Sequence, residues 1–259
     1  MIAHRTPESI WRAMGIDSPA DADIEVIAYF CGATVKYRTL TNCAAQIVGR
    51  GNKAIISVDS RATEERQRFS VAHELGHWLR DRKTIVLSCR SSDLSPSRFR
   101  NFETDREAAA NRFAVELLMP TLLFREAARN RSITMETALD LRRQFQVSRT
   151  AAAIRLIELG SFPSIVVCNG PQGYKWSWRH PELPLSVRVS RRLSKHTQAY
   201  RLLADANAVE TGPMEVDADD WVDQKGSEDY VVTEDSVRLN PHTVLSLIWW
   251  HDEAPLLGR

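Results

Sequence analysis

His73-Glu74-Leu75-Gly76-His77 has the spacing that lets a single α-helix hold a metal ion, and it organises the first half of this chain. The two histidines are four residues apart, which in an α-helix is about 400° of rotation, so both lie on one face with Cβ atoms about 6 Å apart. Two imidazoles can then reach one metal ion, and Glu74 is placed to act as a base for a metal-bound water. The pattern predicts metal-assisted hydrolysis, unless it is a coincidence on a surface helix.

The residues around this motif predict a helix with one buried face. Ser60 or Thr63 can cap its start, and the acids that follow suit the positive end of the helix dipole. Apolar residues recur at spacings of three and four, at Phe69, Ala72, Leu75 and Leu79. Histidines in such a helix need a partner such as a metal, because an unpartnered polar group is costly to bury.

A hydrolytic zinc site takes three protein ligands, and the next helical pattern offers the third. This pattern runs from about Thr104 to Met119 and stops at Pro120. The acids in or near it are Glu103, Asp105, Glu107 and Glu116. Glu107 shares a face with small and apolar residues that can pack on the first helix, and Asn111, one turn later, can hold a ligand in position. We predict Glu107 as the ligand; taken alone, a solvated helix carboxylate is the alternative.

Two blocks of the chain together resemble the ImmA/IrrE family of bacterial metallopeptidases. They are Arg68–Leu79 (RFSVAHELGHWL) and Glu107–Pro120 (EAAANRFAVELLMP), in the family's order, and the similarity covers about residues 6 to 160. The resemblance implies that His73, His77 and Glu107 bind Zn²⁺ and that Glu74 is the general base. It also implies cleavage of a helix-turn-helix repressor, which relieves repression of a mobile element, a DNA-damage response or an anti-phage operon.

The composition is that of a globular intracellular protein. The 259 residues, 43% of them hydrophobic, suffice for one or two domains with substantial cores. The net charge of +1 argues neither for nor against a nucleic-acid partner. Neither a membrane-spanning run nor a signal-peptide core is present, and the four cysteines form no Cys-x-x-Cys pair. We therefore expect a cytoplasmic protein with reduced thiols and no membrane partner.

The order of predicted elements indicates an α+β protein. Residues 1–120 are expected to form a zincin-like metallopeptidase core, with helices over 7–14 and 19–30 and a small antiparallel sheet. Its strands are predicted at 34–37, 44–48 and 54–58, the last two joined by a turn at Arg50-Gly51-Asn52-Lys53.

Residues 121–160 carry two helical patterns, 135–145 and 149–159, in the outline of a helix-turn-helix. The start of the second helix offers little to a base edge, because it reads Thr150-Ala-Ala-Ala-Ile154. A segment that packs on the peptidase core is therefore favoured over a DNA reader.

Residues 161–259 show a mixed α/β pattern. It is compatible with the GAF-like sensory domain that some members of the resembled family carry. Strands are expected at 165–168, 174–178, 185–189, 214–216 and 230–232, and helices at 194–206 and 243–250.

Cys43 lies between two of the predicted strands and offers a second idea about the metal site. A thiolate is a soft zinc ligand that can occupy the place of the substrate water. It would then keep the enzyme inactive until a conformational change or oxidation releases it. The simpler interpretation, which we favour, is a small buried hydrophobe.

Basic and aromatic residues alternate early in the C-terminal part. The cations that are candidates for nucleic-acid contacts are Lys175, Arg179, Arg188, Arg191, Arg192 and Lys195. Interleaved cations and aromatic rings suit a groove for a single strand, where one kind binds phosphates and the other stacks on bases. Trp176 and Trp178 are two apart and face one side of a strand, which favours packing in the core instead.

These features predict a zinc-dependent endopeptidase that cleaves a helix-turn-helix repressor and responds to a signal through its C-terminal domain, with single-stranded DNA as the candidate signal. The alternative is a DNA-binding transcriptional regulator in which zinc only stiffens the fold. Glu74 separates the two, because a structural site needs the ligands but no base.

Overall fold

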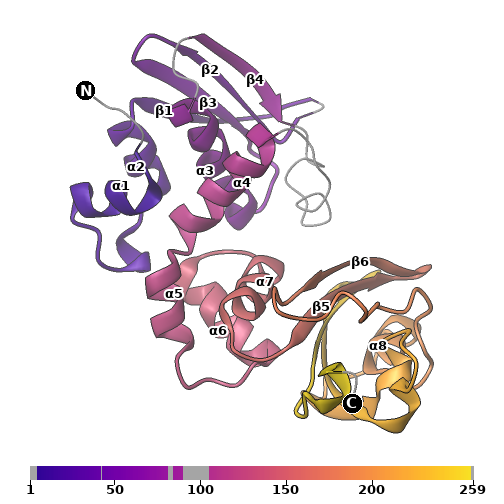
Figure 1. Cartoon of the computed structure of the whole chain (residues 1–259). Coiled ribbons are helices and arrows are strands. Elements are labelled where there is room, and N and C mark those ends of the chain that lie inside the picture. The colour runs from indigo at the N-terminus through magenta and orange to yellow at the C-terminus, as the bar shows by residue number, and fades with distance from the viewer. Residues whose placement is uncertain (1–4, 42, 81–83, 90–104, 258–259) are drawn as a thin grey trace. The chain divides into compact units, whose positions relative to one another are not determined.

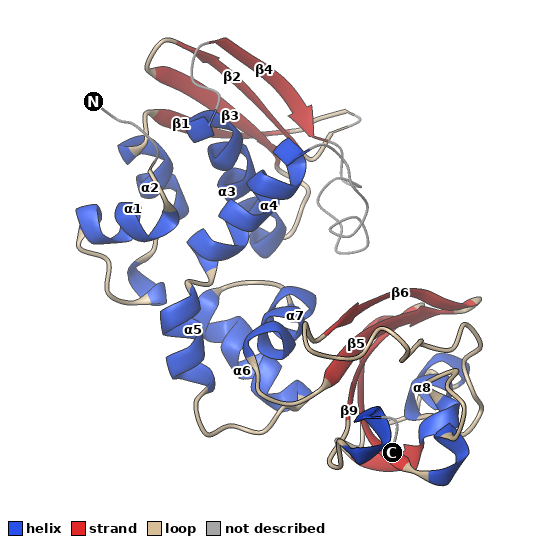
Figure 2. Ribbon diagram, in the orientation of Figure 1, coloured by secondary structure: helices blue, strands red, loops and turns tan. Residues whose placement is uncertain are grey.

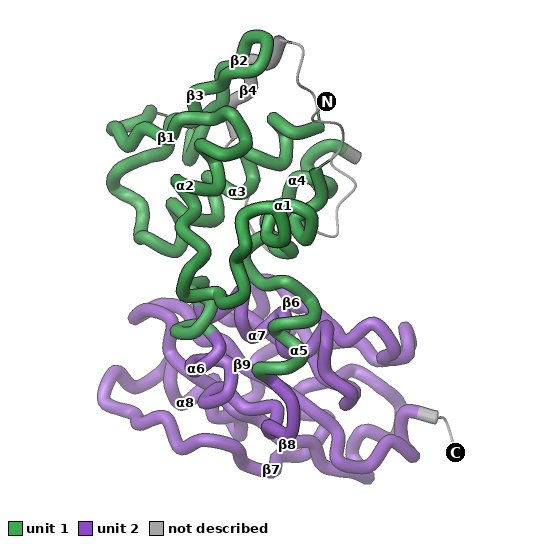
Figure 3. Tube along the Cα trace, turned by 90° about the vertical axis from the view of Figure 1, so that its left-hand side faces the viewer, with its two compact units in different colours: residues 1–127, 142–148 green, residues 128–141, 149–259 purple. Residues whose placement is uncertain are grey.

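The structure, a computed structural model, describes residues 5–41, 43–80, 84–89 and 105–257 (Figure 1). The chain forms two compact units (Figure 3). The first comprises Met1–Ala127 with Arg142–Ser148, and the second Ala128–Leu141 with Arg149–Arg259. Helices and strands occur in both units, so the expected α+β class is confirmed (Figure 2). The predicted boundaries at 120 and 160 stay a prediction.

The first unit begins with two helices, α1 (Pro7–Met14) and α2 (Ile24–Phe30). The single helix expected over 19–30 is split in two, because the segment contains two capping residues. Ser18 caps a 3₁₀ turn at its start, and the Asp23 carboxylate accepts two backbone N–H groups at the start of α2.

The sheet of the first unit has the strand order β1-β3-β2-β4. The strands are β1 (Ala33–Arg38), β2 (Ala45–Arg50), β3 (Lys53–Asp59) and β4 (Thr84–Cys89). The β2–β3 hairpin is confirmed, with Arg50 paired to Lys53 and Gly51 at φ +62° in the turn. The expectation of an antiparallel sheet is wrong for β1, which pairs in parallel with β3. β1 and β2 are consecutive in the chain but are not neighbours in the sheet, because the β2–β3 hairpin places β3 between them.

Beneath this sheet lie α3 (Glu64–Arg80) and α4 (Asp105–Leu118), which pack against each other (Figure 1). Helix α3 contacts α2, β2 and β3 as well. Every residue from Ser70 to Leu79 is consequently buried, the two histidines and Glu74 of the motif included. A helix that is covered on all sides is expected to be apolar all round, so its polar residues stand out.

Three further helices follow: α5 (Thr121–Ala128), α6 (Met135–Phe145) and α7 (Arg149–Leu159). The two helices predicted for the helix-turn-helix outline are confirmed at the predicted bounds. None of the described helices is long and apolar enough to cross a bilayer.

The second unit contains an antiparallel sheet with the strand order β6-β5-β9-β8-β7. The strands are β5 (Ser164–Gly170), β6 (Gly173–Arg179), β7 (Met214–Asp217), β8 (Val231–Asn240) and β9 (Thr243–Trp249), with helix α8 (Gln198–Ala204) against β8 and β9. Its core includes Ile165, Val167, Trp221, Ile248 and Trp250.

Two expectations for the second unit are wrong. The helix over 243–250 is the strand β9, which lies between β5 and β8 and is buried on both faces. This short run is buried at every position, so it has no periodicity that separates strand from helix. The strand over 185–189 is a loop with one bridge, Val189 to Val222, because the Arg179 guanidinium bonds the carbonyls of Leu183, Pro184 and Val187.

Candidate metal centre

The structure brings His73, His77 and Glu107 together at one point between α3 and α4. The two histidine Nε2 atoms are 3.1 Å apart, and each lies 3.2 Å from an oxygen of the Glu107 carboxylate. Ligand atoms on a tetrahedral zinc, at bond lengths of 2.0–2.1 Å, lie about 3.3 Å apart. The donor set and its spacing therefore fit zinc, and among the described residues these three form the group able to hold a metal.

Burial and charge favour the forms of these side chains that bind metal. His73 and His77 are 0% and 1% exposed, respectively. Burial lowers the pKa of His73, which keeps its imidazole neutral and its lone pair available. The adjoining imidazoles of His73 and His77 hold the pKa of Glu107 well below its usual range, so the carboxylate stays ionised.

Asn111 fixes the orientation of His73. Its Oδ1 lies 2.8 Å from His73 Nδ1, and the side chain of Asn111 is buried. Because an amide oxygen only accepts, Nδ1–H is the donor and Nε2 is left to face Glu107. The structure thus gives Asn111 the orienting position that its place in α4 predicted.

Glu74 occupies the turn of α3 between the two histidines and is fully buried. Along the chain Glu74 is one residue from the first ligand and three from the second, and its role as a base stays a prediction. The structure places Glu74 on the same rigid helix as both histidines.

Gly76 sets how closely the two helices approach, and sequence reasoning missed this role. A Cβ at this position would lie 3.1 Å from the Ala110 Cα and 3.2 Å from the Phe113 Cβ. A side chain here would therefore push α4, which carries Glu107, away from the histidines. The available signal was a glycine inside a helical pattern, which is costly unless packing requires it.

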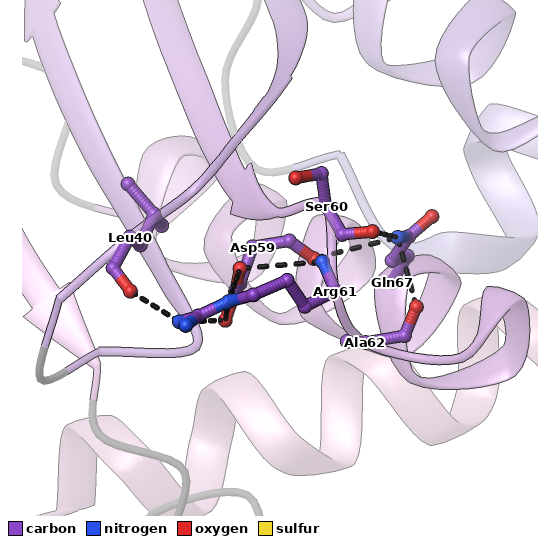
Figure 4. A network of polar contacts seen from close by, with 6 residues as sticks. All are labelled: Leu40, Asp59, Ser60, Arg61, Ala62 and Gln67. Carbon is purple, nitrogen blue, oxygen red and sulfur yellow. Dashed lines mark hydrogen bonds and ion pairs between the residues drawn. The ribbon is translucent and has the colours of Figure 1, made fainter.

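The start of α3 is anchored by a network that sequence reasoning also missed (Figure 4). The Gln67 amide donates to the carbonyls of Asp59, Ser60 and Ala62. The Arg61 guanidinium binds the Asp59 carboxylate and holds the pKa of that carboxyl at about 2. It also donates to the Leu40 carbonyl, in the loop between β1 and β2.

Of the two caps proposed for this helix, Thr63 is the one in place. It accepts from the Arg66 N–H through its hydroxyl and from the Gln67 N–H through its carbonyl. The first turn of α3 is also held in place, because Arg142 near the end of α6 donates to Glu65 at 2.6 Å. The register of the histidines is therefore set from the N-terminal end of α3.

Cys43 is not one of the residues that the structure gathers at the metal group. It is a free, half-buried cysteine in the loop before β2. The idea that it reaches the metal in an inactive state stays a prediction.

The candidate nucleic-acid cations divide into two kinds. Arg179 is turned onto the loop that follows it, and Lys175 donates to the Thr243 hydroxyl at 3.1 Å. The other four, Arg188, Arg191, Arg192 and Lys195, are exposed, and Lys175 is exposed as well. The Arg191 guanidinium lies over the Tyr174 ring at 5.0 Å, so one cation and one aromatic ring of the stretch do meet. Trp176 and Trp178 are half-buried.

Comparison with known proteins shows which family of proteins the part of the chain around the metal group resembles. The model of the IrrE N-terminal-like domain matches residues 31–157, a span that contains every residue of the metal group. A solved structure described as a Mycobacterium tuberculosis transcriptional regulator is similar with a TM-score of 0.58 and 15% identity, over 93% of this chain and 73% of that chain. At this identity the likeness shows the fold alone. No curated protein sequence matches the chain.

Proposed function

We propose that this chain, which belongs to the ImmA/IrrE metallopeptidase family through residues 31–157, is a zinc-dependent endopeptidase. The observation that carries the proposal is the convergence of His73, His77 and Glu107 on one point, with Glu74 buried on the same helix. A purely structural site has no use for this carboxylate, whereas a hydrolase needs a base beside the metal.

The residues of the site divide the work of peptide hydrolysis between them. Zinc bound to His73, His77 and Glu107 supplies Lewis acidity toward a carbonyl or a water. Glu74 takes the proton of the attacking water and passes it to the leaving nitrogen. Asn111 keeps the Nε2 lone pair of His73 directed at the centre. The surrounding burial strengthens each of these electrostatic interactions.

The proposed substrate is a helix-turn-helix repressor, and its cleavage would derepress a stress, prophage or anti-phage defence operon. In this proposal the first unit is a zincin-like core, and the second acts as a GAF-like sensory domain that gates it. Single-stranded DNA is the proposed signal, supported by the exposed cations of the second unit. Salt-dependent affinity for single-stranded DNA, lost in the double variant Arg191→Ala/Arg192→Ala, is expected; no binding at low salt would remove this signal.

A second candidate function is a DNA-binding transcriptional regulator with a structural zinc site. The helix pair α6–α7 and the printed description of the similar mycobacterial structure favour it. The two functions differ in what they require of Glu74.

Glu74→Gln tests the proposal, with the helix-turn-helix protein encoded beside this chain as substrate. We expect the variant to keep its zinc and to lose cleavage, since the amide cannot take a proton. Unchanged DNA binding by this variant, with no proteolysis of the repressor by the wild-type chain, would favour the regulator.

A further inference from the structure

Helix α2 presents an apolar face to solvent. Its inner side, Ile24, Ile27 and Ala28, is buried in the first unit. On the outer side Val26, Tyr29 and Phe30 are 53%, 77% and 37% exposed, and their spacing of three and four residues places them side by side. We call these three residues the α2 stripe. A seven-residue helix with three large exposed apolar side chains is a candidate surface for a partner.

The α2 stripe is bordered by acids. Residues 13–35 contain four acidic residues and no lysine, arginine or histidine. The four acids are exposed: Asp17, Asp21, Asp23 and Glu25. Glu25 lies one helical turn before Tyr29, and burial together with a hydrogen bond to Glu25 raises the pKa of Tyr37 to about 12. A negative border of this kind selects a partner with positive charge.

Two cations approach α2, and both lie at its ends. Arg5 donates to the Phe30 carbonyl at 3.3 Å and stacks on the Phe30 ring. The half-buried Arg68 donates to the Ala22 carbonyl. Among the described residues neither Asp21 nor Glu25 forms an ion pair. Asp21 and Glu25 therefore keep their negative charge.

Helix α2 is attached firmly to α3, which carries two of the three metal ligands. The Trp78 indole, one residue after His77, donates to the carbonyl of Cys31 at the end of α2. Arg68, also on α3, holds the other end of α2. A segment bound to the α2 stripe is thus held by the same rigid unit as the metal centre.

We propose that the α2 stripe docks a basic amphipathic helix of the protein substrate. Apolar residues of that helix would cover the α2 stripe, and its lysines and arginines would face Asp21 and Glu25. Proteins that bind DNA carry such cations because they neutralise phosphates. That the partner is a repressor rests on the proposed function. That the partner is a basic amphipathic helix rests on the exposed residues of the surface alone. The same acids disfavour an anionic membrane or a second copy of this chain, whose acids would meet each other.

The test uses the zinc-loaded full chain and a dye-labelled synthetic helix of 18 leucine and lysine residues in amphipathic order, with binding followed by fluorescence anisotropy. The double variant Val26→Ser/Tyr29→Ser is expected to weaken binding at least tenfold. Asp21→Asn/Glu25→Gln is expected to weaken it several-fold and to reduce its salt dependence. Leu122→Ser, at a 74% exposed leucine on α5 of the same unit, is the matched control and should change nothing.

Three results would overturn the docking surface. One is equal affinity for the wild type and the Val26/Tyr29 variant, provided that both have the same melting temperature and zinc content. Another is equal binding of a leucine–glutamate helix or of phosphatidylcholine vesicles through the same residues. A third is a dimer of the chain, seen by analytical ultracentrifugation, that the variant dissociates.

Cleavage of denatured casein separates this proposal from the proposed function. The wild type and the control variant Leu122→Ser are expected to cleave casein at the same rate, and Glu74→Gln is expected to leave casein intact. Probe binding that depends on the α2 stripe, without any Glu74-dependent cleavage, would leave the docking surface standing and remove the peptidase. Glu74-dependent cleavage, with probe binding unaffected by Val26→Ser/Tyr29→Ser, would leave the peptidase standing and remove the docking surface.

Discussion

Two carboxylates of this chain have different partners. Glu234 in the second unit accepts hydrogen bonds that hold the fold together, whereas Glu107 in the first unit faces two histidines. Glu234, on β8, is fully buried. It accepts from the backbone N–H groups of Gln198 and Ala199, the Ser236 hydroxyl and the Trp221 indole. Gln198 and Ala199 are the first residues of α8, and Glu234 is on β8, so this carboxylate holds α8 on the sheet.

Glu107 on α4 faces side chains instead. Its two oxygens lie beside the Nε2 atoms of His73 and His77, which also lie close to each other. Three ligand atoms that converge in this way leave a place for a cation between them. Burial raises the pKa of Glu234, whereas the imidazoles lower that of Glu107. The comparison shows that a functional site is identified by convergent ligand atoms and not by burial of charge.

The largest contrast is expected for loss of zinc. His77→Ala removes a ligand, so zinc affinity should fall by more than the roughly 10- to 100-fold that is typical of losing an outer partner. Titration against a chromophoric chelator measures this, with Glu234→Ala as the control that keeps wild-type affinity. Equal affinity for zinc in His77→Ala and the wild type would show that His77 is not a ligand.

The reverse contrast is expected for stability. Glu234→Ala leaves the N–H groups of Gln198 and Ala199 without their acceptor, which should cost about 3 kcal/mol in the free energy of unfolding. Urea unfolding of the full chain measures the loss. A variant that unfolds like the wild type would show that these hydrogen bonds do not hold α8.

Asn111→Ala tests whether the orientation of His73 contributes to zinc affinity. Without the amide oxygen, His73 loses the acceptor that fixes its tautomer, so zinc affinity should fall by roughly 10- to 100-fold. Asn111→Asp keeps an acceptor and should recover most of it. If both variants bind zinc equally weakly, packing rather than orientation is what Asn111 provides.

The smallest expected effect is a difference in pH dependence of the zinc-free protein. The pKa of Glu234 in the folded state is raised above the ordinary 4.5, so stability should fall as pH rises from 4.5 through the folded value. The pKa of Glu107 is lowered below the ordinary 4.5, so its contribution is present above pH 4.5 and lost as pH falls. Unfolding series for Glu234→Gln and Glu107→Gln should therefore deviate from the wild type in opposite pH ranges; deviations in the same range would contradict these assignments.

The metal group could be predicted from the sequence because it depends on helical periodicity. The four-residue spacing of His73 and His77 places both on one face wherever the helix lies, and Glu107 followed from the apolar face of the next helix. Gly76 and Gln67 could not be assigned in this way. Their roles depend on which backbone lies opposite, the Ala110 Cα for one and the carbonyls of the 59–62 turn for the other.

The sheets were predicted less well, because a strand takes its character from its neighbours. β9 is buried at every position because it is central, and its composition does not separate it from a buried helix. β1 was recognised as a strand, but its parallel pairing with β3 depends on a chain crossing that no local pattern encodes. Arg179 was a candidate for nucleic-acid contact, yet its guanidinium serves the loop that follows it.

Glu74→Gln shows whether the metal group belongs to a hydrolase. Zinc content and cleavage of the neighbouring helix-turn-helix protein are measured on the same preparation of the variant and of the wild type. We expect full zinc occupancy in both and cleavage by the wild type only. Cleavage by Glu74→Gln at the wild-type rate would contradict this expectation.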